Sequence, residues 1–555
     1  MIGFLIALMI LPLATAALLM LFRDSAGQNT ARWMALIGSV VTFCVAVTCV
    51  AKYQEKQVTA GTSPVQPRIE WRHTWLTYTS QEHHLDPLHL LGPREPGHDF
   101  SQMATVNLEF YLGADGVSLS LIALTALLTI SAVLISWESI KERAAEFYIC
   151  LLVLEAGLIG VFCAFDLLLF YVFFEFTLIP MFFMIGLWGG TQRNFASIKF
   201  FLYTLCGSLI TLLGLAALVL LAARQGVTTP FSIPALAAHF TAHPIESGMQ
   251  TILFLTLSAG FMVKVPLFPF HTWLPLAHVE APTAGSVMLA GVMLKLGSYG
   301  FFRICLPIYR QACLDIGLPI IATLSVIGIV YGSLCALSQR DIKKLVAYSS
   351  VAHLGFCMLG MFALNSEGVT GSLLQMINHG LSTGALFLLV GMVYDRYHTR
   401  QLDDLGGLAN RIPLIAVAMV FTTMASIGLP GLNGFVGEML SLAGMFRIMP
   451  VYAVIGTSGV VLGAWYMLTM VQQGFFGPLR EPHDVHEPVS DMTPREACAF
   501  LPLAVMCVWI GVAPQPFIEL MKPDIQAVVA GYGGSNPQTA NATPDAPTSL
   551  TASRH

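Results

Sequence analysis

The stretch FMVKVPLFPFH, residues 261–271, lies inside an apolar run that covers 250–276 and is long enough to cross a membrane. Pro266 and Pro269 lack an amide hydrogen and cannot bond the carbonyl four residues earlier, so a helix must break here. Unwound backbone at membrane depth is tolerated only where it is buried in protein or lines a water-filled cavity. The stretch therefore predicts a membrane protein with an interrupted span around Lys264.

A second break is expected at GLPGLNGFVGE, residues 428–438, inside the apolar run 412–445. The two breaks lie about 165 residues apart, and spans that begin near 146 and 314 are separated by nearly the same distance. This spacing predicts two five-helix repeats, each with a broken helix, and because five is odd the second copy is inverted. Inverted repeats place ion sites near the membrane midplane in secondary transporters. Two unrelated proline kinks are the alternative, because proline is common in membrane helices.

The composition of the whole chain agrees with this fold class. Of its 555 residues 55% are hydrophobic and only 11% are charged, against about a quarter in soluble domains. The net charge of −5 excludes the basic field that a nucleic-acid partner requires. The eleven cysteines show no C-x-x-C spacing, so neither an iron–sulfur cluster nor a disulfide framework is indicated.

We predict an all-α polytopic membrane protein with about 14 transmembrane helices. Their approximate extents are 1–22, 33–51, 116–137, 146–163, 166–188, 198–222, 250–276, 285–306, 314–337, 345–364, 371–394, 412–445, 452–475 and 496–514.

The distribution of lysine and arginine predicts the orientation of the spans. Most basic residues follow odd-numbered spans, whereas short loops after even-numbered spans hold only Arg224, Arg303, Arg310 and Arg447. We therefore expect a bacterial inner membrane protein with both termini in the periplasm. The first span has no lysine or arginine before it, so we interpret it as a retained helix and not a secretion signal.

The predicted spans divide the chain into five parts. The insert at 52–105 is expected to be an external loop, and its histidines lack a metal-ligand spacing, although a metal site is an alternative to a solvated loop. These histidines are His73, His83, His84, His89 and His98. The parts are 1–145 with the N-terminal helices and this loop, 146–306 as the first inverted repeat, 314–475 as the second, 476–514 with a loop and the last helix, and 515–555 as a disordered external tail.

Six ionisable side chains lie deep inside the predicted spans. An ionisable group at mid-membrane costs at least about 2.5–3.5 kcal/mol on insertion scales, so each is a functional candidate. A carboxylate and an amine of opposite sign lower this cost by pairing, and carboxyl, amine and imidazole groups in a row can relay protons through intervening waters. The six are Glu175, Lys264, Lys295, His353, His379 and Glu438.

Several other interpretations of these residues remain open. Glu175 and Lys264 could form a purely structural ion pair, and a membrane scaffold would need all the buried charges to be inert. The two histidines could be hydrogen-bonded core residues. They could also ligate one haem iron from neighbouring helices, but Lys264 and Lys295 would then have no role.

Four motifs resemble a known family, the antiporter-like subunits of respiratory complex I and the Mrp cation/proton antiporters. The resemblance runs from GADG at 113–116 to the last predicted span; the 77–105 insert and the tail depart from it. The four motifs are AGFMVKVP at 259–266, HTWLPLAH at 271–278, APTAGSV at 281–287 and GLPGLNGFVGE at 428–438.

Within this family, Glu438 resembles the M type of subunit, whereas the L and N types and the Mrp subunits carry lysine after the second break. The chain also ends about 40 residues after the last predicted span, too soon for the lateral helix of the L type. The resemblance implies that Glu175 and Lys264 form a paired switch and that Lys295 is the central station. It further implies that His353 and His379 connect that station to Glu438, the terminal group on the exit side.

The implied function is proton translocation in NADH-quinone oxidoreductase, driven by an electrostatic change that arrives from a neighbouring subunit. The chain has no Rossmann fingerprint, so we expect no redox site, cofactor or metal in it. FMN, iron–sulfur clusters and quinone are expected in partner subunits. The implied partners are the other membrane subunits, including the L and N paralogues, and the lipid bilayer. An Mrp-type Na⁺/H⁺ antiporter subunit is the alternative.

Overall fold

The computed structural model describes residues 2–21, 27–54, 64–79, 105–482 and 489–533. These parts are mostly helical, and twelve helices or helix runs in them are long and apolar enough to cross a membrane. The twelve are α1 (Ile2–Leu21), α2 (Gln28–Gln54), α3 (Gly116–Ser139), α4 (Ala144–Cys163), α5 with α6 (Leu167–Phe176 and Leu178–Trp188), α7 (Arg193–Arg224), the run α11, η2, α12, η3 and α13 (Thr283–Met288, Leu289–Met293, Lys295–Gly300, Phe301–Cys305 and Leu306–Ile308), the run α14, η4 and α15 (Arg310–Ala312, Cys313–Gly317 and Leu318–Leu337), α16 (Ile342–Met361), α17 (Ser366–Tyr397), α20 (Pro450–Phe475) and α21 (Pro494–Val512).

Polar side chains fix where several of these helices begin. A side-chain oxygen at the N-cap accepts a hydrogen bond from a free amide of the first turn, which stabilises a helix by about 0.5–2 kcal/mol over alanine at that position. Such caps start α3, α5, α16 and α17 at Asp115, Asp166, Asp341 and Asn365.

Both predicted helix breaks are present. Helix α9 (Ser247–Lys264) ends at Lys264, and the chain turns before it resumes as α10 (Leu274–Glu280). Helices α18 (Pro413–Ser426) and α19 (Asn433–Ile448) are separated by a turn in which Gly428 and Gly431 have φ angles of +77° and +92°, a region that favours glycine. The two interrupted spans, α9 with α10 and α18 with α19, are therefore not among the twelve long apolar helices or helix runs. The total of 14 spans and the inverted relation of the two repeats stay predictions.

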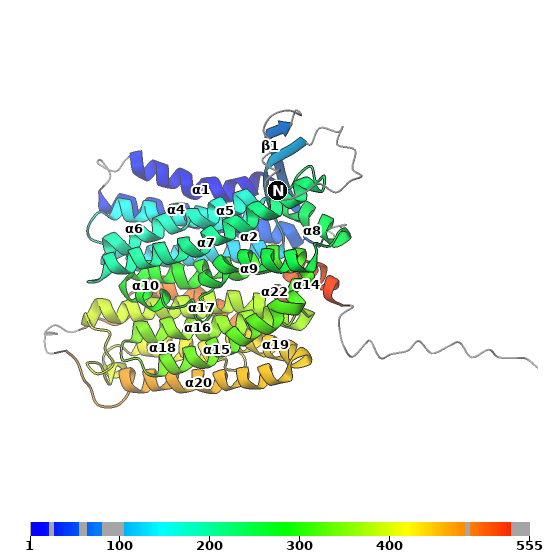
Figure 1. Cartoon of the computed structure of the whole chain (residues 1–555). Helices are drawn as coiled ribbons and strands as arrows, with labels where there is room; N and C mark the ends of the chain where they lie inside the picture. Colours follow the sequence, from blue (N-terminus) through cyan, green and yellow to red (C-terminus); the bar gives the residue numbers. More distant parts are fainter. Residues whose placement is uncertain (1, 22–26, 55–63, 80–104, 483–488, 534–555) are drawn as a thin grey trace, which may run out of the picture.

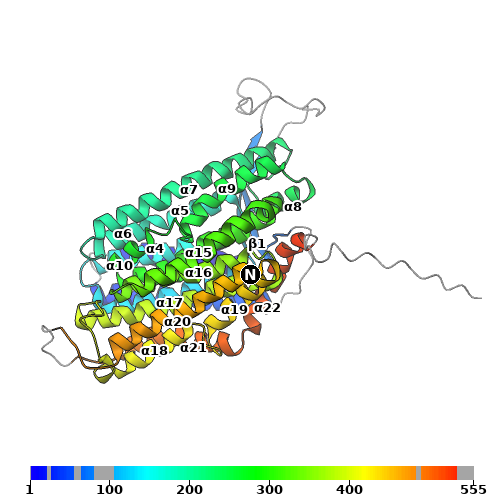
Figure 2. The same cartoon turned by 60° about the horizontal axis from the view of Figure 1, so that its bottom comes forward.

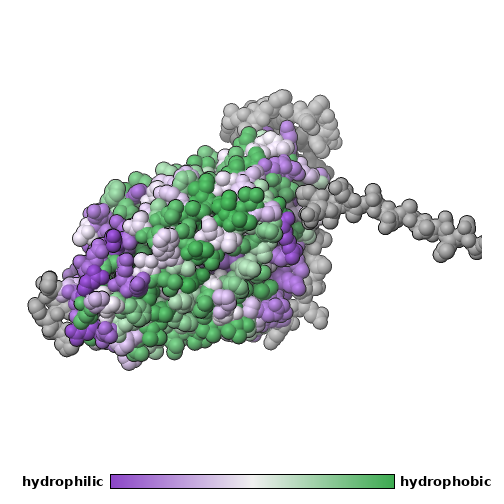
Figure 3. All heavy atoms as spheres, turned by 90° about the horizontal axis from the view of Figure 1, so that it is seen from below, coloured by the Kyte–Doolittle hydropathy of each residue, from purple (hydrophilic) through white to green (hydrophobic). Residues whose placement is uncertain are grey.

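The helices lie side by side in one bundle (Figures 1 and 2), and in Figure 1 α1 lies at one edge, α20 at the other, and α16 and α17 between them. In the most apolar stretch of α17 all residues are buried, and the same holds for the run Thr283–Ile308. In the corresponding stretches of α1 and α2 only 33% of the residues are buried. Helix α17 and the run Thr283–Ile308 therefore form the core of the bundle. Figure 3 shows an apolar band between two hydrophilic ends, as expected for a protein whose middle is covered by lipid.

The remaining elements lie outside the long helices. The insert predicted as a loop contains part of a two-stranded antiparallel sheet, in which Ile69 pairs with Ala114. His73 lies on its first strand and stacks on Trp71; His83, His84, His89 and His98 lie outside the described residues. The other elements are β1 (Ile69–Thr79), β2 (Thr105–Ala114), α8 (Ile233–Ala242), η5 (Leu408–Asn410), α22 (Gln515–Val529) and η6 (Ala530–Tyr532).

The prediction of a disordered tail from residue 515 is wrong for 515–532, which form α22 and η6. Helix α22 is amphipathic, and its apolar face is buried against α3 and α17. The apolar residues recur at helical spacing, a signal that was overlooked beside the polar composition of the chain end. They are Leu520, Met521, Ile525 and Val528. Residues 534–555 lie outside the described residues.

Candidate functional site

Four of the six predicted residues lie in one buried row. The Lys295 Nζ atom is 2.7 Å from His379 Nδ1, and the rings of His379 and His353 are edge to face with their centroids 5.9 Å apart. His353 Nδ1 is in turn 2.7 Å from Glu438 Oε1. The four side chains come from four different helices, and none of the four residues is more than 6% exposed. The structure thus brings together residues that are up to 143 positions apart in the sequence.

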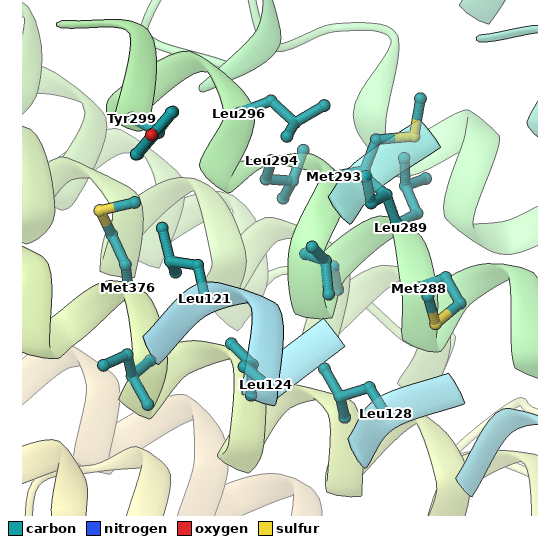
Figure 4. Close-up of a cluster of buried hydrophobic side chains, with 14 of the residues drawn as sticks. Leu121, Leu124, Leu128, Met288, Leu289, Met293, Leu294, Leu296, Tyr299 and Met376 are labelled. Carbon is teal, nitrogen blue, oxygen red and sulfur yellow. The ribbon is translucent and has the colours of Figure 1, made fainter. Parts of the chain in front are cut away.

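Lys295 is positioned by an irregular helix. It follows η2, a π-helical segment, and its ammonium group donates a hydrogen bond to the Ala290 carbonyl of that segment. Short π-helical segments inside α-helices frequently mark functional sites. Leucine and methionine side chains from α3, η2, α12 and α17 form an apolar cluster in this part of the bundle (Figure 4). His379 is therefore the side chain through which Lys295 joins the polar row.

Side chains that the sequence analysis missed hold the other end of the row. Gln375 Nε2 donates to Glu438 Oε1 at 3.0 Å, and Ser426 Oγ is 3.2 Å from His353 Nε2. Gln375 comes from α17, and Ser426 is the last residue of α18, next to the second break. Amide and hydroxyl groups in apolar helices were the available signal. They are common in membrane helices, however, and nothing in the sequence distinguishes these two from the others.

A pair of asparagines fixes the second break against α17. Asn378 Nδ2 donates to the Asn433 carbonyl at 2.7 Å, and Asn433 Nδ2 donates to the Asn378 carbonyl at 3.1 Å. Asn433 is the first residue of α19, so the two bonds set the position from which this helix carries Glu438 toward His353. The broken helix therefore has a direct structural role in building the row.

The geometry does not favour a haem between the two histidines. Both ring nitrogens of His353 already have a polar neighbour, Glu438 at one and Ser426 at the other. Because an axial ligand needs a free ring nitrogen, His353 has none to offer. Among the residues that the structure describes, no group of three or more His, Cys, Asp or Glu side chains could hold a metal ion.

Glu175 and Lys264 do not form the predicted ion pair in this structure. Lys264 is 2% exposed, and its Nζ atom lies 4.6 Å from the centre of the Phe174 ring without a hydrogen bond. The ring face attracts the cation, so it replaces part of what a carboxylate would supply. Neither carboxylate oxygen of Glu175, one residue further along α5, has a hydrogen-bond partner among the described residues.

Other buried ionisable groups lie outside the six predicted residues. Arg303, expected in an external loop, is instead buried in η3 with a nitrogen 2.5 Å from Asp115. His278 on α10 is fully buried and stacks on Phe387, with ring centroids 4.6 Å apart. Glu155 on α4 is also fully buried. Its position in the middle of an apolar span was a signal that the sequence analysis overlooked.

The row can act as a proton relay. An imidazole accepts a proton on one nitrogen and releases one from the other, so the two histidines can link an amine to a carboxyl group. Lys295 and Glu438 are the ends of this link, and both can gain or lose a proton. The arrangement suits proton transfer within the core of the membrane layer.

Comparisons with known proteins agree with one another. The model of a family described as NADH:quinone oxidoreductase/Mrp antiporter, transmembrane, matches residues 164–463. The NADH-quinone oxidoreductase subunit M of Rhodobacter capsulatus is 41% identical over 539 residues, 96% of this chain and 98% of that protein. The NADH-ubiquinone oxidoreductase chain 4 of Marchantia polymorpha is 45% identical over 424 residues, 76% of this chain and 83% of that protein.

Solved structures extend this likeness. A chain of respiratory complex I from Thermus thermophilus with bound NADH has a TM-score of 0.78 and 28% identity, covering 96% of this chain and 100% of that chain. A chain of the Mrp complex from Dietzia sp. has a TM-score of 0.75 at 20% identity, covering 95% of this chain and 98% of that chain. The second likeness shows a shared fold alone.

Proposed function

Because this chain belongs to the NADH:quinone oxidoreductase/Mrp antiporter transmembrane family, we propose that it is a proton-translocating membrane subunit of an NADH-quinone oxidoreductase. The buried row from Lys295 to Glu438 is the observation that carries the proposal. Four ionisable groups in contact at mid-membrane have a large insertion cost. Inert packing residues would avoid that cost, and a proton path accounts for it.

Each residue of the row has a proposed role. Lys295 is the central station that holds a proton, and His379 and His353 carry it to Glu438, the terminal group. Glu175 and Lys264 act as a switch whose two members approach one another only in part of the cycle. In this structure they do not form an ion pair, and Lys264 rests against an aromatic ring. A change of charge in a neighbouring subunit would shift the balance between the two arrangements.

The surroundings of the chain follow from the same proposal. Oxidation of NADH, with FMN, iron–sulfur clusters and quinone, takes place in partner subunits, and the chain itself works as a translocase. Its neighbours are the other membrane subunits, including the L and N paralogues. The membrane is the bacterial inner membrane, with both termini in the periplasm. A cysteine at the exposed Thr77 of β1 should then react with an impermeant maleimide added to sealed cells, and labelling only in inverted vesicles would contradict this orientation.

The decisive experiment is purification of the intact assembly, followed by reconstitution into liposomes. We expect the chain to remain bound to flavin and iron–sulfur subunits, and NADH oxidation with added quinone to acidify one side of the membrane. A colourless assembly that exchanges Na⁺ for H⁺ without NADH would contradict the proposal and favour an Mrp-type antiporter.

A further inference from the structure

Glu155 is a buried acid that the proposed path does not use. It is 0% exposed, and neither of its carboxyl oxygens has a hydrogen-bond partner among the described residues. It lies eleven residues after the start of α4 and eight before its end, so at 1.5 Å per residue it is about 12–16 Å from either end. An ionised carboxylate without a countercharge is very costly at this depth, so the neutral, protonated acid is the form that fits the site.

The neighbouring helix α3 turns a face of hydroxyl groups inward. Three hydroxyls on this face each donate to the carbonyl one turn earlier, at 2.6–2.9 Å, so their oxygens remain able to accept a proton donor. Thr129 lies close enough to the Glu155 carboxyl to interact with it, and it also contacts Met288, seven residues before Lys295. The face consists of Ser118, Thr125, Thr129 and Ser136 at intervals of seven, four and seven residues, each at most 1% exposed.

This hydroxyl face ends in a polar network at the sheet-bearing end of α3. Ser118 Oγ is 2.9 Å from Tyr299 Oη and accepts a hydrogen bond from Arg303 at 3.3 Å. Arg303 pairs with Asp115, the cap residue that directly follows β2. On this side of the bundle, polar groups therefore lie both at the start of α3 and beside Glu155.

We propose that Glu155 is a further proton-binding side chain of the pump, which exchanges its proton along the hydroxyl face of α3. The inference rests on the proposed function, because it adds a residue to the same translocation. Waters that hydrogen-bond to the hydroxyl oxygens complete the route between Ser118 and Thr125. A carboxyl group that only filled space would gain nothing over an apolar side chain of similar volume.

The test compares Glu155→Gln and Thr129→Val with a matched control in the purified assembly. The control is Thr42→Val, because Thr42 is also fully buried and donates to the carbonyl one turn earlier, but on α2. Infrared spectra in H₂O and D₂O report protonated carboxyl groups, and proton uptake per NADH reports pumping. We expect Glu155→Gln to remove one protonated-carboxyl band and more than half of the pumping. Thr129→Val should lower pumping by less, and Thr42→Val should leave both readings unchanged.

Wild-type pumping in Glu155→Gln would overturn the inference, whether or not the band disappears. Loss of pumping with the band intact would also overturn it, because the acid would then not be the protonated group. Glu155→Asp, which keeps the carboxyl group, should retain part of the pumping. That result would show that the loss in Glu155→Gln is not caused by misfolding. If the wild-type assembly itself does not pump with NADH, the proposed function fails instead.

Discussion

The two parts of the proposed path hold their charged groups in opposite ways. Lys295 and Glu438 are joined to the histidines between them by contacts of 2.7 Å at each end. Glu175 and Lys264, which have the opposite charges needed for an ion pair, do not form one. Burial differs at one of these groups: Lys264 is 2% exposed and Glu438 is 4% exposed, but Glu175 is only partly buried.

This contrast indicates that the pair and the row have different roles. A buried charge without its partner is costly, so Glu175 and Lys264 would lower their energy by approaching one another. Such a pair is suited to switching. The row has polar contacts at both ends, with the two histidine rings edge to face between them, and it is suited to conduction. The predictions below test whether the two parts differ in this way.

The largest effect is expected from Lys295→Met, which keeps the side-chain volume but removes the proton-carrying amine. His379 would then lose its neighbour at 2.7 Å, and the row would lose the proton-carrying group at one of its two ends. We expect NADH-driven proton uptake in inverted vesicles to fall at least about tenfold, because a positioned acid–base group typically contributes about 10²–10⁴-fold to a rate. Lys199→Met is the control, since Lys199 lies near the start of α7. More than half of the wild-type uptake in Lys295→Met would show that the row does not conduct.

The sequence was sufficient to find the members of this row but not its contacts. The cost of a charge inside an apolar span is local, so Lys295, His353 and Glu438 could each be recognised from their flanking residues. Which groups meet depends on helix packing and on the π-helical turn before Lys295, which the spacing of apolar residues does not reveal. For the same reason the prediction of an ion pair at Lys264 rested on charge alone and overlooked the ring of Phe174.

The next effect concerns the separated pair. We expect Glu175→Gln and Lys264→Ala each to remove most of the pumping, because either change leaves the switch with one charge. The double variant should be no worse than the single variants, since groups that act as a unit are not additive. The measurement is NADH-driven proton uptake by the two single variants and the double variant, in assemblies of equal subunit content. A double variant whose loss is the product of the two single losses would mean that the residues act independently.

A smaller effect is expected at the end of the row. Glu438→Gln can still bond His353 and Gln375 but cannot release a proton, so it should lose most turnover. Glu438→Asp should keep part of it, and Glu438→Lys should not restore it, because lysine is positive when it carries a proton whereas the acid is neutral. Glu367→Gln, on the exposed start of α17, is the control. Near-normal quinone-coupled pumping in Glu438→Gln would remove Glu438 from the path.

The smallest effect is expected from Ser426→Ala, which changes a group beside the row and none within it. Ser426 Oγ is 3.2 Å from His353 Nε2, so its loss leaves that nitrogen without a partner and frees the ring to turn. One such hydrogen bond contributes about 0.5–1.5 kcal/mol. We therefore expect proton uptake per NADH to fall about two- to tenfold, closer to twofold if water replaces the hydroxyl. Thr422→Val is the matched control, because Thr422 lies one turn earlier on α18 and donates only to the Ala418 carbonyl. If both variants lose pumping equally, the effect of Ser426 is on packing of α18. If only Ser426→Ala loses pumping, the orientation of the His353 ring sets the rate at which the row conducts protons.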